Sequence, residues 1–146
     1  GVVLWIAPLL LGPDADVFDR LAGFAPHQVD QLRCHILDPR HSEVRDHLAA
    51  TCRRLAVDYD LDGLKIDFLD QAMVYRGTPS TGDHDDVGEA MRVLLGQIRD
   101  ELAAAGRGDL AVEFRQPYVS PAIGAYGQIL RAGDCPGDAV VNRRST

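Results

Sequence analysis

The sequence has no apolar run long enough to mark a membrane protein. The stretch GVVLWIAPLLLG at residues 1–12 is apolar but is interrupted by Pro8. A membrane-spanning helix needs about 20 consecutive apolar residues, and no run approaches that length. We therefore expect no membrane partner.

Cysteine is scarce, and no cysteine or histidine spacing is typical of a metal site. Cys34, Cys52 and Cys135 are far apart and form no CxxC pair, which favours reduced thiols in a cytoplasmic protein. His84 lies in the acidic stretch 82–86, a composition more typical of a solvated loop before a helix. No strand-like run is followed by a GxGxxG fingerprint or a P-loop. We expect neither a metal nor another cofactor.

Positive charge is also in short supply. Lysine and arginine number 15 against 22 aspartates and glutamates, and the formal net charge is −7. Binding to nucleic-acid phosphates needs clustered basic residues, so we expect no nucleic-acid partner. A neutral or cationic partner is compatible with this charge.

What the sequence does contain is an alternation of strand-like and helix-like segments. One apolar stripe at spacings of three and four follows Ser42, a candidate helix cap, and a second stripe ends before Gly106. The patterns predict strands at 2–7, 35–38, 63–68, 110–115 and 128–134. They predict helices at 42–59 and from 87 to about 105, with shorter ones near 15–22 and 119–127.

This alternation is typical of parallel βαβ units. The predicted fold class is α/β, as part of a (β/α)8 TIM barrel with about four βα units and parallel strands. A full barrel needs roughly 250 residues. We therefore expect residues 1–146 to be the central portion of a catalytic barrel, incomplete at both ends.

Charged residues gather at the ends of three predicted strands. In LDGLKIDF at 61–68, the two-residue period of a strand directs Lys65 and Asp67 toward the barrel axis, opposite to Leu64, Ile66 and Phe68. Active sites of barrels lie at the carboxyl ends of the strands, where Asp67 stands.

The next two strands repeat this pattern. Glu113 and Arg115 share one face, and Asp134 ends the last strand. Paired carboxylates such as Asp67 and Asp134 suit glycoside hydrolysis. A structural ion pair of Lys65 with Asp67 or a neighbour is the alternative.

Several segments together resemble the clan D glycoside hydrolases, specifically the melibiase-type α-galactosidases. LDGLKIDF resembles the nucleophile strand of that family, and ILRAGDCPGD at 129–138 resembles its acid/base strand. VLWIAP at 3–8 resembles the third barrel strand, and ILDPRHSEVRDHL at 36–48 resembles the segment before the nucleophile strand. The resemblance covers nearly the whole chain, as barrel strands three to six.

The resemblance implies a role for each matching residue. Asp67 would be the nucleophile of a retaining enzyme, and Asp134 the general acid and then the base. Lys65 would hold sugar hydroxyls and keep Asp67 ionised. Asp138 would bind sugar or hold the loop after Asp134. Apart from the resemblance, Trp5 is a candidate for stacking on a sugar, with a place in the core as the alternative.

The chain also departs from the family. Ala7 stands where many members have an acidic residue, and VEFRQPYVSP at 112–121 replaces a cysteine- and glycine-rich substrate segment. Glu113 and Arg115 would then offer different polar groups to the substrate.

The sequence is compatible with three functional hypotheses. The first is an α-galactosidase-like hydrolase acting on an oligosaccharide or another α-galactoside. The others are an α-glycosidase of different sugar specificity and a non-catalytic carbohydrate-binding barrel remnant. Open barrel edges would leave the isolated piece inactive unless it formed a homo-oligomer.

Overall fold

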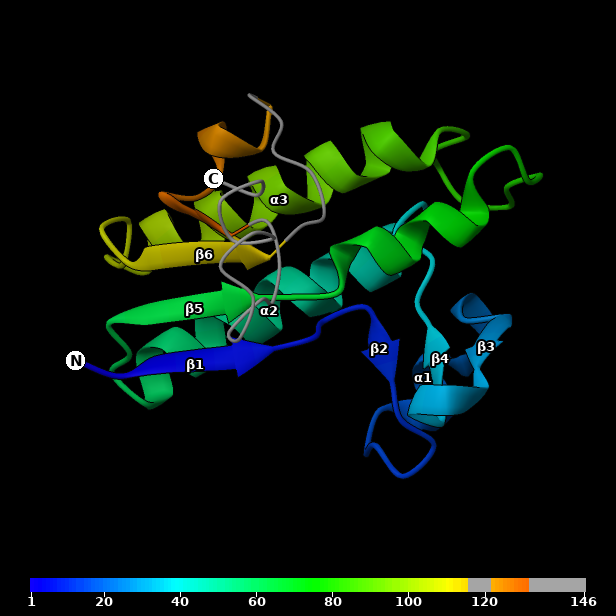
Figure 1. Ribbon diagram of the computed structural model, residues 1–146, viewed down its shortest axis with the longest axis horizontal. Helices are drawn as coiled ribbons and strands as arrows, with labels where there is room; N and C mark the ends of the chain where they lie inside the picture. Colours follow the sequence, from blue (N-terminus) through cyan, green and yellow to red (C-terminus); the bar gives the residue numbers. More distant parts are fainter. Residues whose placement is uncertain (116–121, 132–146) are drawn as a thin grey trace, which may run out of the picture.

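A four-stranded parallel sheet is the centre of the protein, in a computed structural model that describes residues 1–115 and 122–131. The strand order is β1-β5-β6-β7, and every pairing between neighbours is parallel. The carboxyl ends of the strands therefore meet at one edge of the sheet (Figure 1). The strands are β1 (Val3–Ile6), β5 (Gly63–Ile66), β6 (Ala111–Arg115) and β7 (Ile129–Arg131). The predicted α/β class with parallel strands is confirmed.

Two long helices, α2 (Ser42–Asp58) and α3 (Val87–Ala104), cover one face of this sheet (Figure 1). The covered face carries Leu64, Ile66 and Phe114, which are almost inaccessible to solvent. The predicted helical stripes supply the other side of this core, mainly Val44, Leu48, Cys52, Leu94, Ile98 and Leu102. Within the described part of the chain, no helix is both long and apolar enough to cross a membrane.

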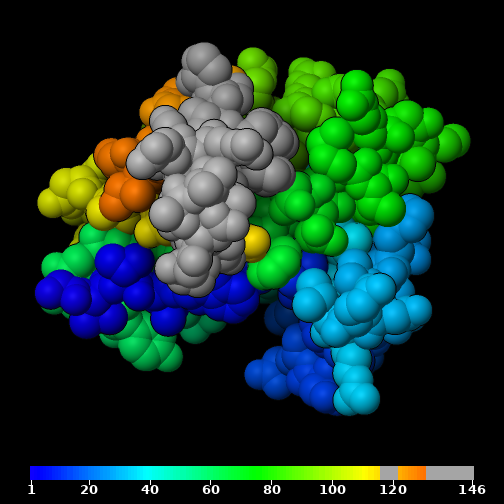
Figure 2. Space-filling view, viewed as in Figure 1, coloured from blue at the N-terminus to red at the C-terminus, as the bar shows by residue number. Residues whose placement is uncertain are grey.

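A second, antiparallel sheet follows β1. It has the order β2-β4-β3, from β2 (Leu10–Leu11), β4 (Cys34–Ile36) and β3 (His27–Val29). Its connections hold α1 (Phe18–Leu21), η1 (Ala22–Phe24) and η2 (Asp30–Leu32). Figure 2 shows this segment, coloured blue to cyan, as a lobe beside the parallel sheet.

The strand predicted at 35–38 therefore lies outside the parallel sheet. Its side chains alternate between buried and half-buried, as in an antiparallel strand with one covered face. The strand ends at Ile36, and the carboxylate of Asp38 accepts the backbone N–H of Arg40 in a turn.

The remaining elements are short 3₁₀ helices, η3 (Leu69–Tyr75) after β5 and η4 (Ile123–Ala125) before β7. η4 is all the helix that the described residues form within the predicted range 119–127. Gly106 has a positive φ of 74° just past α3, as predicted for a residue that ends a helix.

Candidate active site at the carboxyl edge of the parallel sheet

The face of the sheet opposite α2 and α3, called the open face below because no described helix covers it, brings the predicted charged residues together. Trp5 pairs in register with Lys65, which pairs with Glu113. One step further along, Asp67 and Arg115 stand side by side, with Arg115 Nη1 3.4 Å from Asp67 Oδ1. Lys65, Asp67, Glu113 and Arg115 thus share the face opposite to Leu64, Ile66 and Phe114, and their orientation toward a barrel axis stays a prediction.

Asp67 is the most enclosed of these residues, with only 4% of its surface exposed. Its backbone N–H still bonds to the carbonyl of Ile6, so the first residue beyond β5 is held against β1. Oδ1 accepts the backbone N–H of Phe68 at 2.8 Å, and Oδ2 accepts the indole Nε1–H of Trp5 at 2.8 Å. Both carboxylate oxygens are therefore fixed by donors.

These contacts decide the ionisation of the carboxyl group. Burial alone would raise the pKa of Asp67, but the hydrogen bonds from Trp5 and Phe68 and the charge of Arg115 outweigh it. The pKa of Asp67 is therefore lowered from its ordinary value of 3.8. An ionised, oriented carboxylate at this edge can act as a nucleophile or stabilise a developing cation.

The cation that contacts Asp67 is Arg115, whereas the family resemblance gave this role to Lys65. Lys65 Nζ lies 4.0 Å from Glu113 Oε1, and both side chains are largely enclosed. The sequence held a sign of this arrangement, because Lys-x-Asp on β5 lies beside Glu-x-Arg on β6. Opposite charges across neighbouring strands attract, but only the register shows which residues face each other.

Phe68 was expected to face the helices with Leu64 and Ile66, and that expectation is wrong. The strand ends at Ile66, and Phe68 has a positive φ of 58°, which turns the chain. Its ring lies edge-on to Trp5 at 6.3 Å, and the guanidinium of Arg115 lies 5.7 Å from its centroid. A left-handed backbone is unfavourable for phenylalanine, and such strain is common beside functional groups.

Trp5 does not belong to the buried core. It is 51% exposed on the open face of the sheet, although its indole nitrogen reaches Asp67. An exposed indole face on this side of the sheet is compatible with stacking on a sugar.

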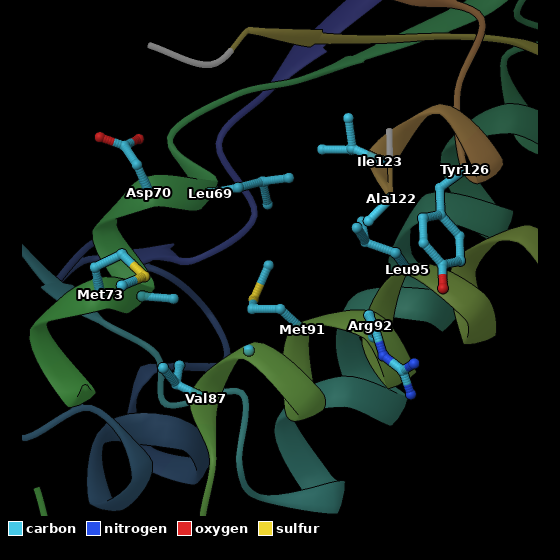
Figure 3. Close-up of a pocket in the computed structure, with 12 residues that line it drawn as sticks. Leu69, Asp70, Met73, Val87, Met91, Arg92, Leu95, Ala122, Ile123 and Tyr126 are labelled. Atoms are coloured by element: carbon cyan, nitrogen blue, oxygen red, sulfur yellow. The ribbon is translucent and has the colours of Figure 1, made fainter. Parts of the chain in front are cut away.

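A separate apolar pocket of about 180 Å³ lies between η3, α3 and η4. Figure 3 shows Leu69, Met73, Met91 and Ile123 around it, with Asp70 and Arg92 among the lining residues. Ligand sites usually measure about 300–1,000 Å³ and hold a few convergent polar groups. The pocket is therefore a weaker candidate for sugar binding than the charged face.

In residues 1–115 and 122–131, no group of three or more His, Cys, Asp or Glu side chains is arranged to hold a metal ion. His84 lies near Asp83 and Glu89, 3.7 and 3.9 Å from their carboxylates, in the loop before α3.

Two predicted site residues, Asp134 and Asp138, lie outside the described residues. The strand before Asp134 is β7, which pairs with β6. β7 thus lies two positions from β5 in the sheet, as the sequence predicted. The partnership of Asp134 with Asp67 stays a prediction.

Several solved structures with a similar fold are α-galactosidases. One from Thermus thermophilus, in complex with stachyose, has a TM-score of 0.62 at 21% identity, over 89% of this chain and 28% of its own. A variant family 36 enzyme from Geobacillus stearothermophilus, also with stachyose, has a TM-score of 0.70 at 13% identity, over 98% and 21%. One from Lactobacillus brevis has a TM-score of 0.64 at 16% identity, over 96% and 20%.

These likenesses confirm at the level of fold the resemblance found in the sequence. The chain spans between a fifth and somewhat over a quarter of the length of these three structures. No protein-family model matches the sequence, and no curated protein matches it.

Proposed function

We propose that the chain is the central portion of the catalytic barrel of a retaining glycoside hydrolase of the α-galactosidase type. The observation that carries this proposal is Asp67, a buried carboxylate with a lowered pKa at the carboxyl edge of a parallel sheet. The shared fold supports it, because the similar structures are α-galactosidases and two of them hold stachyose. The proposed substrates are oligosaccharides or other α-galactosides with a terminal α-linked galactosyl residue.

The proposed reaction is a double displacement. An oxygen of Asp67 attacks the anomeric carbon while Asp134 donates a proton to the departing glycosidic oxygen, which leaves a covalent glycosyl-enzyme. Asp134 then takes a proton from water, the water oxygen bonds to the anomeric carbon, and the Asp67 carboxylate departs. Asp67 must be ionised at the start of the reaction. The charge of Arg115 and the hydrogen bonds from Trp5 and Phe68 favour this ionised form.

The rest of the barrel is part of the same proposal. β1 and β7 are the edge strands of the described parallel sheet. We propose that further strands pair with these edges, either from the same polypeptide or from a second copy. Completion would enclose the open face that carries Lys65, Asp67, Glu113 and Arg115.

Replacement of Asp67 tests the proposal in the full-length enzyme, with an aryl α-galactoside as substrate. Asp67→Ala should lower turnover by several orders of magnitude, and azide should restore it with release of a β-galactosyl azide. Asp67→Asn should be inactive in the same way. Unchanged turnover in both variants would rule out Asp67 as the nucleophile.

An α-glycosidase of different sugar specificity is the second candidate, and one observation favours it. Glu113 pairs with Lys65 next to Asp67 on the open face, and Glu113 belongs to VEFRQPYVSP at 112–121, which replaces the cysteine- and glycine-rich substrate segment of the family it resembles. A panel of aryl α-glycosides compared by kcat/KM distinguishes the two. Preference for a glucoside or another pyranoside over the galactoside would select this candidate.

A further inference from the structure

The contact between Trp5 and Asp67 joins two strands of the sheet. Trp5 lies on β1 opposite Lys65, one step before Asp67 along the sheet. Its Nε1 reaches across to Oδ2 of Asp67 at 2.8 Å. The indole also packs edge-on against Phe68, at an interplanar angle of 86°. The tryptophan is thus held at its edge, while about half of its surface stays exposed.

The two oxygens of Asp67 are not equivalent. Oδ1 accepts the backbone N–H of Phe68 at 2.8 Å and faces Arg115 Nη1 at 3.4 Å. Oδ2 accepts Trp5 Nε1. A carboxylate oxygen has two lone pairs, so among the described residues two donors address Oδ1 and one addresses Oδ2. Among the described residues, one lone pair of Oδ2 therefore has no donor and can form a new bond.

We propose that Trp5 is a positioning residue that orients Asp67 so that Oδ2 is the attacking oxygen. This inference rests on the proposed function. The Nε1–H bond restrains rotation of the carboxylate and occupies one lone pair of Oδ2, so that the other lone pair would form the new bond. As Oδ2 bonds to the anomeric carbon, the bond from that carbon to the leaving oxygen breaks, and Arg115 and Phe68 hold Oδ1.

Trp5 therefore acts through its N–H group, which separates this role from a sugar platform. Phenylalanine keeps an aromatic face and the contact with Phe68 but has no donor. If Trp5 only stacked on sugar, Trp5→Phe would be nearly harmless and Trp5→Ala would mainly raise KM. If Trp5 positions Asp67, Trp5→Phe lowers kcat/KM about tenfold or more, the effect of losing one hydrogen bond to a charged group, with KM nearly unchanged.

The acidic limb of the pH profile is a second readout. Among the described residues, the groups that share this face with Asp67 are Trp5 from β1, Lys65 on its own strand, and Glu113 and Arg115 from β6. Loss of the Trp5 donor raises the pKa of Asp67, because that hydrogen bond favours the charged form. The acidic limb of kcat/KM in Trp5→Phe should therefore move to higher pH. Tyr59→Phe, at a 65% exposed position after α2, is the matched control and should leave the limb in place.

A spectroscopic measurement tests the contact without any activity. The ¹⁵N-labelled indole Nε1–H resonance of Trp5, identified by its absence in Trp5→Phe, should shift as Asp67 protonates at low pH. The shift should vanish in Asp67→Asn. If the resonance does not shift as Asp67 protonates, or if Trp5→Phe keeps the acidic limb of the wild type, the role of Trp5 is overturned. The proposed function would stand in either case. Full turnover by Asp67→Asn overturns the proposed function.

Discussion

At the scale of single residues, the open face of the sheet is ordered by alternating charge. Lys65 stands beside Glu113, and Asp67 stands beside Arg115. Each positive side chain thus has a negative neighbour on the next strand. The arrangement satisfies a structural ion pair and a catalytic site equally well, because both need Asp67 ionised. The enclosed position of Asp67 at the carboxyl edge favours catalysis, since a purely structural pair does not need that edge.

The ionisation of Asp67 makes a prediction about stability and pH. Its pKa is lower in the folded protein than its ordinary value of 3.8. Asp67 therefore contributes stability that is complete above that value and is lost as the pH falls through the folded pKa. The difference in unfolding free energy between wild type and Asp67→Asn should be constant near neutral pH and should shrink below about pH 4. Urea denaturation measures it, and a difference that grows on acidification would contradict the assignment.

A second residue-scale prediction concerns a buried ion pair away from the site. Arg40 is 2% exposed and binds the carboxylate of Asp38 through Nε and Nη2, while Nη1 donates to the carbonyl of Thr78. Arg40→Met should cost about 3–5 kcal/mol of unfolding free energy, because Asp38 would remain as a buried charge without its partner. Chemical denaturation gives the value.

The matched control for Arg40 is Arg53, which faces Glu101 at 3.6 Å with both side chains about half exposed. Arg53→Met should change the unfolding free energy by less than about 1 kcal/mol, as for other solvated pairs. Equal losses of unfolding free energy in Arg40→Met and Arg53→Met would mean that the buried pair contributes no more to stability than the exposed one.

At the scale of elements, local patterns in the sequence predicted what short-range physics controls. The apolar stripes of α2 and α3 and the buried alternation of β5 and β6 were right, because burial of one face sets those periods. The strand at 35–38 was predicted without a partner, because pairing partners distant in the sequence are not encoded in a run of a few residues; in the structure it pairs with β2 and β3. Phe68 was placed on the wrong face, because a period of two holds only while the strand continues.

Helix capping gives an element-scale prediction in which the sequence expectation also needs correction. Ser42 was expected to cap α2, but its hydroxyl donates to Glu43, and the N-cap position is His41. Asp86 does cap α3, since Oδ1 accepts the backbone N–H of Glu89 at 2.8 Å. Asp86→Ala should therefore destabilise the protein by about 1 kcal/mol, and Ser42→Ala by only a few tenths.

Thermal and urea unfolding of the two capping variants provide the comparison. The two residues occupy the N-terminal ends of the two long helices that cover the sheet, so the sites differ mainly in the hydrogen bond. A larger loss for Ser42→Ala than for Asp86→Ala would contradict the observed caps.

At the scale of the whole molecule, the two faces of the parallel sheet differ in how far the described residues cover them. The helix-covered face is closed by a continuous core that includes Leu64, Ile66 and Phe114. On the other face, Val3, Trp5 and Ile129 are 55%, 51% and 47% exposed in the described part of the chain. The fold is thus fixed from one side, and the proposed pocket needs partners on the other. The alternation of apolar and charged residues in 63–68 predicted this division, and the count of βα units predicted the open edges.

The open edges lead to the last prediction, which concerns the 146-residue chain by itself. Unpaired edge strands with apolar side chains recruit other strands, so the chain should self-associate, and its monomer should not hydrolyse an aryl α-galactoside. Sedimentation velocity combined with an activity assay measures both. Lysines introduced as Val3→Lys and Ile129→Lys, on the edge strands β1 and β7, should weaken association. Val57→Lys, at a 47% exposed position on α2, should not. A monomeric wild-type chain with full hydrolytic activity would show that the sheet needs no further strands to form its site.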